Sequence, residues 1–446
     1  MYRFFRIAPA LLAVLSTPVW AADKAVTFNK DVAPIVFENC ASCHRPGEIG
    51  PFSLLDYESA RPWAKSIRQA VAERKMPPWH ADSSKVHFLN DRSLKQADVD
   101  TILAWVDQGA KQGDPADLPK APKFNDAWAM GEPDMIFEPT REFNVPAGEQ
   151  QIEYQSIHFS PQVTEDLYIT EWEILPTVRK SVHHANLVRA PGELQPVGIG
   201  QAVMKGGDYI GSYLPGARPM QYPKGTALRI PAGSNIQIQV HYVGQDQPIT
   251  DHIRFGVKLA QGRVDKIVRT CGTDDYAIKI EPNGTFTMDT EVTLNFPLTI
   301  LSSGAHMHTR GNAYTTSAVL PDGTEKLIAD VPRYDWNWQS NYELAQPVQV
   351  PQGTKYRVHA FWDNTPNNPE AVDPTKAVTY GPWTENEMLT TWSHVVLTDE
   401  KLGLKVENGR AVGKFEDAVD SAHPAILQTL PNTFSMPRKT QTTGDE

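Results

Sequence analysis

Ile236-Gln237-Ile238-Gln239-Val240-His241 is the stretch of sequence that indicates most clearly how this chain folds. Apolar and polar residues alternate along it, which is the pattern of a β-strand that buries one of its faces. Similar runs recur between turns rich in Gly, Pro, Asn and Asp, at residues 168–175, 227–230, 291–300, 313–320 and 355–362. Short strands at such spacing predict all-β sandwiches or jelly rolls.

The residues before these strands follow a different pattern. Apolar residues recur at helical spacing in residues 31–39, in 57–73 and from Ser93 onward, and a Pro-rich stretch at 113–124 separates this part from the strands. The strand pattern then continues for about 300 residues, which is more than one sandwich needs. Gly272, Pro282 and Gly284 interrupt it, so we expect a seam at residues 271–284.

The predicted fold class is therefore multidomain, with a small all-α domain followed by two all-β domains of the jelly-roll or β-sandwich type. The 446 residues are enough for several cores. The predicted boundaries are 1–22 for a signal peptide, 23–112 for the helical domain, 113–124 for a linker, 125–275 and 276–431 for the two β domains, and 432–446 for a flexible tail.

The first residues have the pattern of an export signal. Arg3 and Arg6 precede a mostly apolar run at residues 7–19, and Val19-Trp20-Ala21 resembles a cleavage site. We therefore expect a cleaved signal peptide and a periplasmic protein. No later apolar stretch reaches about 18 residues, so no stable membrane span is expected. The net charge of −11, without a Lys/Arg cluster, argues against a nucleic-acid partner.

Two of the three cysteines lie in the run Cys40-Ala41-Ser42-Cys43-His44. Redox dithiols share this spacing but need a surrounding βαβ unit, and a zinc site would need a second Cys pair. Neither is present. In an exported chain, with a helix before it, the run predicts one covalently attached haem c with His44 as an axial ligand. The third cysteine, Cys271, is interpreted as a small buried apolar residue.

The sixth ligand of the haem iron should follow later in the helical part. Met76, in the segment 74–80, is the first candidate because the prolines after it hold an extended backbone. His80 is the alternative. The whole segment resembles class I cytochrome c, which implies electron transfer at an iron with both axial positions filled and an all-α cytochrome c domain.

Three histidines of the strand part form the first cluster of candidate metal ligands. His183 and His184 are adjacent, and His241 ends the alternating run quoted above. Adjacent residues of a flat strand point to opposite faces, so both His183 and His184 can bind one ion only if the backbone bulges there. An isolated histidine pair is more often part of a polar strand face than a metal site.

The second cluster is His306-Met307-His308, with Met388 farther along the chain. Alternate residues of a strand share a face, so His306 and His308 can converge on one metal. Imidazoles suit Zn, Cu, Fe or Ni, and a thioether ligand favours copper, especially Cu(I).

The order and local context of these residues resemble the copper type II, ascorbate-dependent monooxygenases, the family of peptidylglycine α-hydroxylating and dopamine β-monooxygenases. The similarity covers about residues 125–400, including the contexts Gln239-Val240-His241-Tyr242 and Glu387-Met388. The resemblance implies two coppers, one in each β domain. It implies that the first is held by His183, His184 and His241, and the second, catalytic one by His306, His308 and Met388.

Departures from the family concern the substrate. Gly304 stands where the peptide-directed enzyme has an Arg, and Thr390 and Trp392 stand where it has Asn and Tyr. The groups that bind a peptide carboxylate are therefore missing, and a glycine-extended peptide is not expected. The animal enzymes are rich in disulfides, whereas this strand part contains only Cys271.

The resemblance implies a periplasmic dicopper monooxygenase that hydroxylates a C–H bond of a small organic substrate with O2. The haem would relay electrons from a periplasmic donor in place of ascorbate. One alternative is a non-enzymatic copper-binding and electron-transfer protein, and another is a zinc-dependent hydrolase with an accessory cytochrome. The histidines expected to be structural or exposed are His158, His252, His359, His394 and His423, of which His394 lies nearest to Met388.

Overall fold

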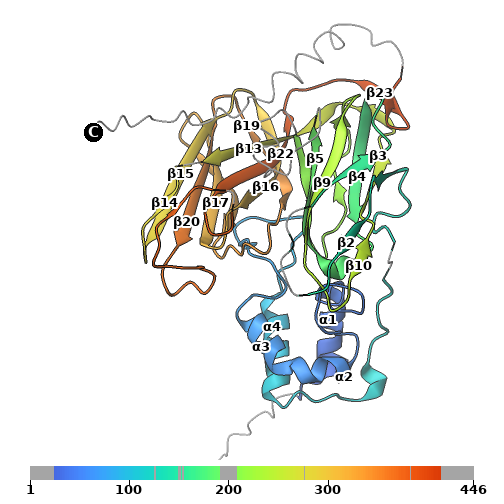
Figure 1. The fold of residues 1–446 in the computed structure, drawn as a ribbon, viewed down its shortest axis with the longest axis vertical. Helices are drawn as coiled ribbons and strands as arrows, with labels where there is room; N and C mark the ends of the chain where they lie inside the picture. The colour runs from blue at the N-terminus through green and yellow to red at the C-terminus, as the bar shows by residue number, and fades with distance from the viewer. Residues whose placement is uncertain are drawn as a thin grey trace, which may run out of the picture.

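The computed structural model of the chain describes residues 25–124, 127–148, 152, 155–190, 208–275, 277–381 and 383–412. The predicted signal peptide at 1–22, the predicted tail at 432–446 and His423 lie outside these residues. Strand accounts for 42% of the chain and helix for 13%. Figure 1 shows two β-rich bodies beside each other, with the helices gathered below them.

The predicted fold class is wrong, because no sizeable all-α cytochrome domain is present among the described residues. The N-terminal part, residues 25–112, contains short helices joined by long irregular segments. Its α-helices are α1 (Ala33–Asn39), which continues a π-helical turn at Phe28–Val32, α2 (Tyr57–Ala60), α3 (Ala64–Ala72) and α4 (Gln96–Asp107). Short 3-10 turns lie at Arg61–Trp63, Pro115–Asp117 and Arg179–Ser181.

The N-terminal part also shares its core with the strands. Phe28, Ile102 and Trp105 pack in a small helical core, but Trp79 and Phe88 bury their side chains in the core of the C-terminal strands. The ring of Trp79 lies 5.0 Å from that of Tyr342. A self-contained helical domain would keep such aromatic side chains in its own core, where their burial stabilises it most.

The first β-region comprises residues 135–264. Its strands are β1 (Met135–Pro139), β2 (Phe143–Val145), β3 (Gln155–Ser160), β4 (Leu167–Leu175), β5 (Val182–Ala190), β6 (Asp208–Tyr213), β7 (Met220–Gln221), β8 (Thr226–Ile230), β9 (Asn235–Tyr242), β10 (Ile249–Asp251), β11 (Arg254–Leu259) and β12 (Gly262–Val264). The sheet that contains β4 and β11 and the sheet that contains β5 and β9 bury one apolar core between them.

The second β-region comprises residues 278–412. Its strands are β14 (Lys279–Ile280), β15 (Thr285–Thr293), β16 (Leu298–His306), β17 (Gly311–Val319), β18 (Glu325–Val331), β19 (Tyr342–Val350), β20 (Lys355–Asp363), β21 (Val378–Thr379), β22 (Leu389–Leu397), β23 (Leu404–Glu407) and β24 (Arg410–Ala411). The four-stranded sheet β15-β20-β17-β18 packs on the sheet that contains β16 and β22. The strand predicted at 291–300 is wrong, because β15 and β16 are separate strands with Pro297 in the turn between them.

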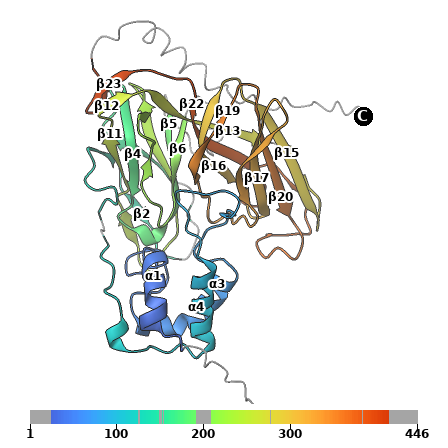
Figure 2. The same cartoon turned by 180° about the vertical axis from the view of Figure 1, so that it is seen from behind.

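One strand, β13 (Lys266–Asp275), belongs to both regions. Its first residues pair in parallel with β8, and its later residues pair antiparallel with β22. The hydrogen-bonded order β19-β16-β22-β13-β8-β4-β11-β1-β3-β9-β5-β6 therefore runs through both regions without a break. Figures 1 and 2 show β13, β16 and β22 beside β5 and its neighbours, where the two regions meet. The domain boundary predicted at residues 275 and 276 falls at the end of this shared strand.

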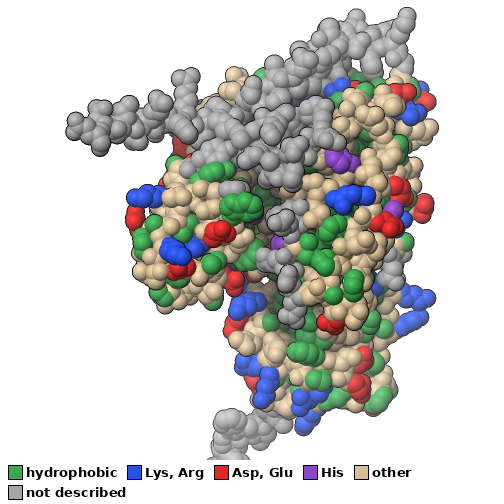
Figure 3. All heavy atoms as spheres, viewed as in Figure 1, with side chains coloured by type: hydrophobic (Ala, Val, Ile, Leu, Met, Phe, Trp, Pro, Cys, Tyr) green, Lys and Arg blue, Asp and Glu red, His purple; other side chains and the backbone are tan. Residues whose placement is uncertain are grey.

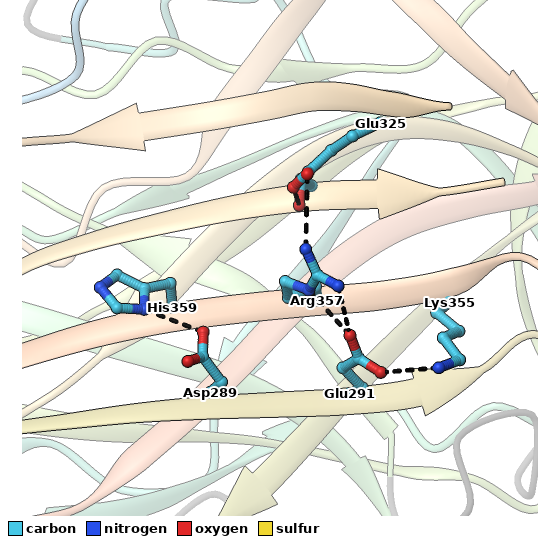
Figure 4. A network of polar contacts seen from close by, with 7 residues as sticks. Asp289, Glu291, Glu325, Lys355, Arg357 and His359 are labelled. Atoms are coloured by element: carbon cyan, nitrogen blue, oxygen red, sulfur yellow. Dashed lines mark hydrogen bonds and ion pairs between the residues drawn. The ribbon is translucent and has the colours of Figure 1, made fainter. Parts of the chain in front are cut away.

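The outer face of the four-stranded sheet carries ordinary surface ion pairs. Glu291 pairs with Lys355 at 3.0 Å and with Arg357 at 2.7 Å, and His359 pairs with Asp289 at 2.8 Å (Figure 4). Exposed pairs of this kind stabilise a fold little. On the face drawn in Figure 3, cationic and anionic side chains occur together on the helical part and on the β-regions. Among the described helices, none is long and apolar enough to cross a membrane.

Candidate metal centres

The first centre is formed by two neighbouring strands of the first β-region. Tyr242 pairs with Val182, but His241 pairs with His184, so β5 carries an extra residue at His183. This is the bulge that the sequence requires, and it turns His183 toward the side of His184. The metal-binding nitrogens of His183, His184 and His241 all lie within 4.8 Å of one another. The predicted first set of ligands thus comes together.

The three imidazoles of the first centre are arranged around a common point. The ring centroids of His183 and His241 are 5.3 Å apart, and each lies 5.1 Å from that of His184. The Nδ1 atoms of His183 and His241 face each other at 3.4 Å. Three imidazole nitrogens converging at this spacing form a ligand set that suits Cu or Zn.

Burial keeps these imidazoles neutral. It lowers the pKa of His183 and His184, and it lowers the pKa of His241 to about 4, with the neighbouring His183 acting in the same direction. Neutral imidazole is the form that binds a metal ion, so near neutral pH the metal would displace few protons from these rings.

The second centre lies at the end of β16. The ring centroids of His306 and His308 are 5.1 Å apart, and both side chains are largely buried. Burial lowers the pKa of His306 to about 3, with His308 contributing, while the side-chain oxygen of Gln339, as an acceptor beside the ring, opposes this shift. Nδ1 of His308 donates to the carbonyl of Asn386 at 3.0 Å, which leaves Nε2 as the donor for a metal.

Glu387 links the backbone of His308 to the segment that carries Met388. The buried Glu387 carboxylate accepts the backbone N–H of His308 at 2.9 Å and that of Arg310 at 2.7 Å. Thr390 of β22 pairs with His306 in register, and Met388 lies in the chain just before β22, between Glu387 and Leu389. Desolvation raises the pKa of Glu387 to about 7.

A third donor for the second centre would have to be the thioether of Met388. Among the described residues, only the first centre groups three or more His, Cys, Asp or Glu ligand atoms within 4.8 Å. Nδ1 of His306 is buried and has no hydrogen-bond partner, which is costly unless a ligand satisfies it. The residues present therefore fit a copper ion held by two imidazoles and one thioether.

The two centres lie across the junction of the β-regions from each other. His306 is one of the groups whose positive charge would lower the pKa of His184. Two further contacts cross the same junction: Trp392 of β22 packs on Tyr209 of β6, with ring centroids 5.5 Å apart, and Arg218 pairs with Glu343 at 2.6 Å. The side chain of Trp392 fills the space over Gly304, where a Cβ would lie 2.5 Å from it.

The Cys40–His44 run forms a turn at the end of α1. The N–H groups of Cys43 and His44 both donate to the carbonyl of Cys40, at 3.1 and 2.9 Å. Nδ1 of His44 donates to the carbonyl of Phe52 at 3.2 Å, which leaves Nε2 free to bind iron. Both thiols are free and partly exposed. The donor set therefore fits covalent haem attachment with His44 as a ligand.

Met76 and His80 both line one cavity of about 430 Å³ between the N-terminal part and the second β-region. His80 is 6% exposed, and its Nδ1 has no hydrogen-bond partner, whereas Met76 is half-buried. Cys40, Cys43 and His44 do not line this cavity. Met76 and His80 therefore both remain candidates for the sixth ligand of the haem iron.

The Cys40–His44 turn packs against the first β-region close to the first centre. The Glu48 carboxylate, just after this turn, pairs with Arg45 and with Arg179, each at 2.7 Å. Arg179 precedes β5 by three residues, and β5 carries His183. The guanidinium of Arg92 bonds the carbonyls of Pro215 and Gly216, and Gly216 in turn lies against the thiol of Cys43.

Three further histidines, His252, His359 and His394, are engaged in other contacts. His252 pairs with Glu138 at 2.9 Å, and His359 is bound to Asp289. His394 is buried, and its Nε2 donates to the carbonyl of Ile210 at 3.0 Å, so it does not serve as a ligand for the second centre. Cys271 is 5% exposed, in agreement with its interpretation as a buried residue.

His394 should make the stability of the protein depend on pH. Burial lowers its pKa to about 4, so the unfolded chain binds a proton that the folded chain refuses, and stability is lost as the pH falls from 6.5 toward 4. The loss approaches about 3 kcal/mol. In urea denaturation of the metal-free protein, the free energy of unfolding of the parent should fall by about 3 kcal/mol more than that of His394→Gln between pH 6.5 and pH 4. An identical pH dependence in the parent and the variant would contradict this assignment.

Sequence reasoning missed several residues that hold the two centres. They come from the loop between β18 and β19: Tyr334 bonds the backbone of Met307, Trp336 packs on the ring of His183, and Gln339 lies beside His306. Their only signal in the sequence is an aromatic run, Tyr334-Asp335-Trp336-Asn337-Trp338, that fits neither a strand nor a helix pattern. Glu387 was noted only as part of the sequence context of Met388.

Comparisons with known proteins do not identify the chain. No family model and no curated protein matches it. Among solved structures, it is similar to the major capsid protein P2 of bacteriophage PM2, with 10% identity, a TM-score of 0.29, and coverage of 62% of this chain and 99% of that one. PBCV-1 VP54, fitted into a reconstruction of the virophage Sputnik, gives 10% identity, a TM-score of 0.23, and coverage of 64% and 96%. Likenesses at these TM-scores say nothing about what this chain does.

Proposed function

We propose that this chain is a periplasmic copper-dependent monooxygenase that hydroxylates a C–H bond of a small organic molecule with O2. The observation that carries the proposal is the pairing of two unlike centres across one junction. The first offers His183, His184 and His241, and the second offers His306 and His308 beside Met388. When bound, copper would supply the oxygen and redox chemistry of these centres, and haem on Cys40 and Cys43 would supply electrons from a periplasmic donor.

The protein's own residues contribute geometry and a dry environment. All five imidazoles have pKa values lowered by burial, so they are neutral donors near neutral pH. Glu387 links the backbone of His308 to the segment that carries Met388. A soft thioether in only one of the two centres would stabilise Cu(I) there more than in the other.

The position of the Cys40–His44 turn supports an electron-delivery role for the N-terminal part. The buried carboxylate of Glu48 joins this turn to Arg179, close to the start of the strand that bears His183. The turn is therefore tied to the first centre rather than to the second by these contacts. This supports delivery of electrons to the first centre, with oxygen chemistry at the second.

The test is oxygen uptake by copper-loaded protein with reduced haem, run beside metal analysis. We expect one copper at each centre, one haem, and reoxidation of the haem by O2 that disappears in His306→Ala. A screen of small organic substrates for hydroxylated product would follow.

Two outcomes would contradict the proposal. Copper bound at both centres, with no copper-dependent haem reoxidation in the presence of the screened substrates, would favour a non-enzymatic copper-binding and electron-transfer protein. Zinc bound in place of copper would reject copper chemistry altogether.

A further inference from the structure

The loop at residues 332–341, between β18 and β19, contacts both metal centres and is called here the bridging loop. It belongs to the second β-region, yet part of it reaches across to the first centre. At its start, Pro332 and Arg333 line the cavity that also contains Met76 and His80. Besides residues at the two centres, the loop contacts Glu370 through Trp336 and Glu73 through Arg333.

One end of the bridging loop is anchored in the second centre. The hydroxyl of Tyr334 accepts the backbone N–H of Met307 at 3.0 Å and donates to the carbonyl of Met307 at 2.8 Å. Met307 lies between His306 and His308, so these two bonds hold the backbone that carries both ligands. Gln339, which is 5% exposed, lies beside the ring of His306.

The middle of the bridging loop reaches His183. The ring of Trp336 packs edge-to-face with the ring of His183, with ring centroids 6.4 Å apart, and the backbone of Asn337 follows directly. Nδ1 of His183 faces Nδ1 of His241 at 3.4 Å, so the loop packs on a ring that belongs to the three-histidine cluster.

We propose that the bridging loop positions His183 of the first centre from an anchor in the second, with Tyr334 as the positioning residue. Tyr334 touches no metal ligand side chain. It acts by holding the loop so that Trp336 packs on His183 and fixes the orientation of its ring, and loss of groups that orient metal ligands changes metal affinity about 10- to 100-fold. The inference rests on the proposed function in taking copper as the metal, but its test requires no oxygen chemistry.

The test uses the full chain with His308→Ala, which leaves the first centre as the single complete copper site. Cu(I) affinity is measured by competition with a chromophoric chelator, and the Cu(II) form is examined by electron paramagnetic resonance. Tyr334→Phe should weaken Cu(I) binding at the first centre about tenfold and change the copper hyperfine coupling. Gln339→Leu loosens the other anchor and should act in the same direction.

Tyr356→Phe is the matched control. Tyr356 is a buried tyrosine of the same β-region whose hydroxyl bonds Ser303 and Ser393, at 3.0 and 3.1 Å, without contacting the bridging loop. It should leave the affinity and the spectrum of the first centre unchanged. An equal effect of Tyr356→Phe would mean a general loss of packing and would overturn the inference.

The remaining outcomes separate this inference from the proposed function. If the His308→Ala chain binds Cu(I) and neither Tyr334→Phe nor Gln339→Leu alters the first centre, the positioning role is overturned and the copper assignment stands. If the His308→Ala chain binds no Cu(I) at all, the proposed function and the inference both fail.

Discussion

Replacing His241 with Ala should remove copper from the first centre and leave the second centre loaded. The variant keeps His183 and His184 but breaks the set of three imidazoles that lie within 4.8 Å of one another. We expect the Cu(I) affinity of the first centre to fall about a thousandfold, equivalent to about 4 kcal/mol. Metal analysis after dialysis against a chelator should show the loss of one copper from each chain.

His394→Gln is the control for His241→Ala. His394 is also a buried histidine, but its ring is bound to the carbonyl of Ile210 and it belongs to no cluster of candidate ligands. The control should keep both coppers. Copper retained by His241→Ala with the affinity of the parent would show that the three-histidine cluster is a buried polar group and not a metal site.

Replacing Met388 with Ala should abolish oxygen chemistry while leaving the haem absorption spectrum unchanged. Met388 directly follows Glu387, whose carboxylate bonds the backbone of His308, and it is a soft donor. We expect O2-dependent reoxidation of the haem to fall at least about 100-fold, since even the loss of groups that only orient metal ligands costs up to that factor. Stopped-flow absorption of the reduced, copper-loaded protein measures this rate.

Met307→Leu provides the matched thioether control. Met307 lies between the two histidines, but it is fully buried in the apolar core of the second β-region. Its replacement by Leu changes the core little and should leave reoxidation close to that of the parent. Retained activity in Met388→Ala, or an equal loss in Met307→Leu, would contradict the assignment of Met388.

The elements that could be predicted from the sequence are those specified by local patterns. Alternation over residues 236–241 predicts a strand, and β9 is found there; the run at 168–175 corresponds to β4. The bulge at His183 also follows from a local argument, because adjacent strand residues can share a face only if the backbone bends.

What could not be predicted depends on contacts between distant parts of the chain. Phe88 pairs with Leu344 across more than two hundred residues, and no local pattern shows that Trp79 and Phe88 belong to a β core. The all-α domain was predicted from helical spacing and from the resemblance to class I cytochrome c, neither of which reveals how short the helices are or where the aromatic residues between them are buried. The strand β13 is shared by two regions because it pairs with both β8 and β22, and no local sequence pattern shows which strands will pair.

The candidate sites show the same division. The histidines were found because their spacing on strands has a direct meaning for metal binding. The bridging loop was missed because the contacts of Tyr334 and Gln339 with the His-x-His segment join strand to loop across the fold. Glu387 is a similar case, since its burial and its bonds to His308 and Arg310 appear only when β16 and β22 are side by side.

X-ray absorption spectroscopy of the reduced, copper-loaded protein tests the central claim most directly, because it reports the ligand atoms of the metal itself. The account predicts imidazole scattering from both coppers and a sulfur scatterer from one of them, and the sulfur contribution should vanish in Met388→Ala but persist in Met307→Leu. Copper bound with no sulfur scatterer, or a sulfur signal that survives Met388→Ala, would contradict the account of two unlike centres.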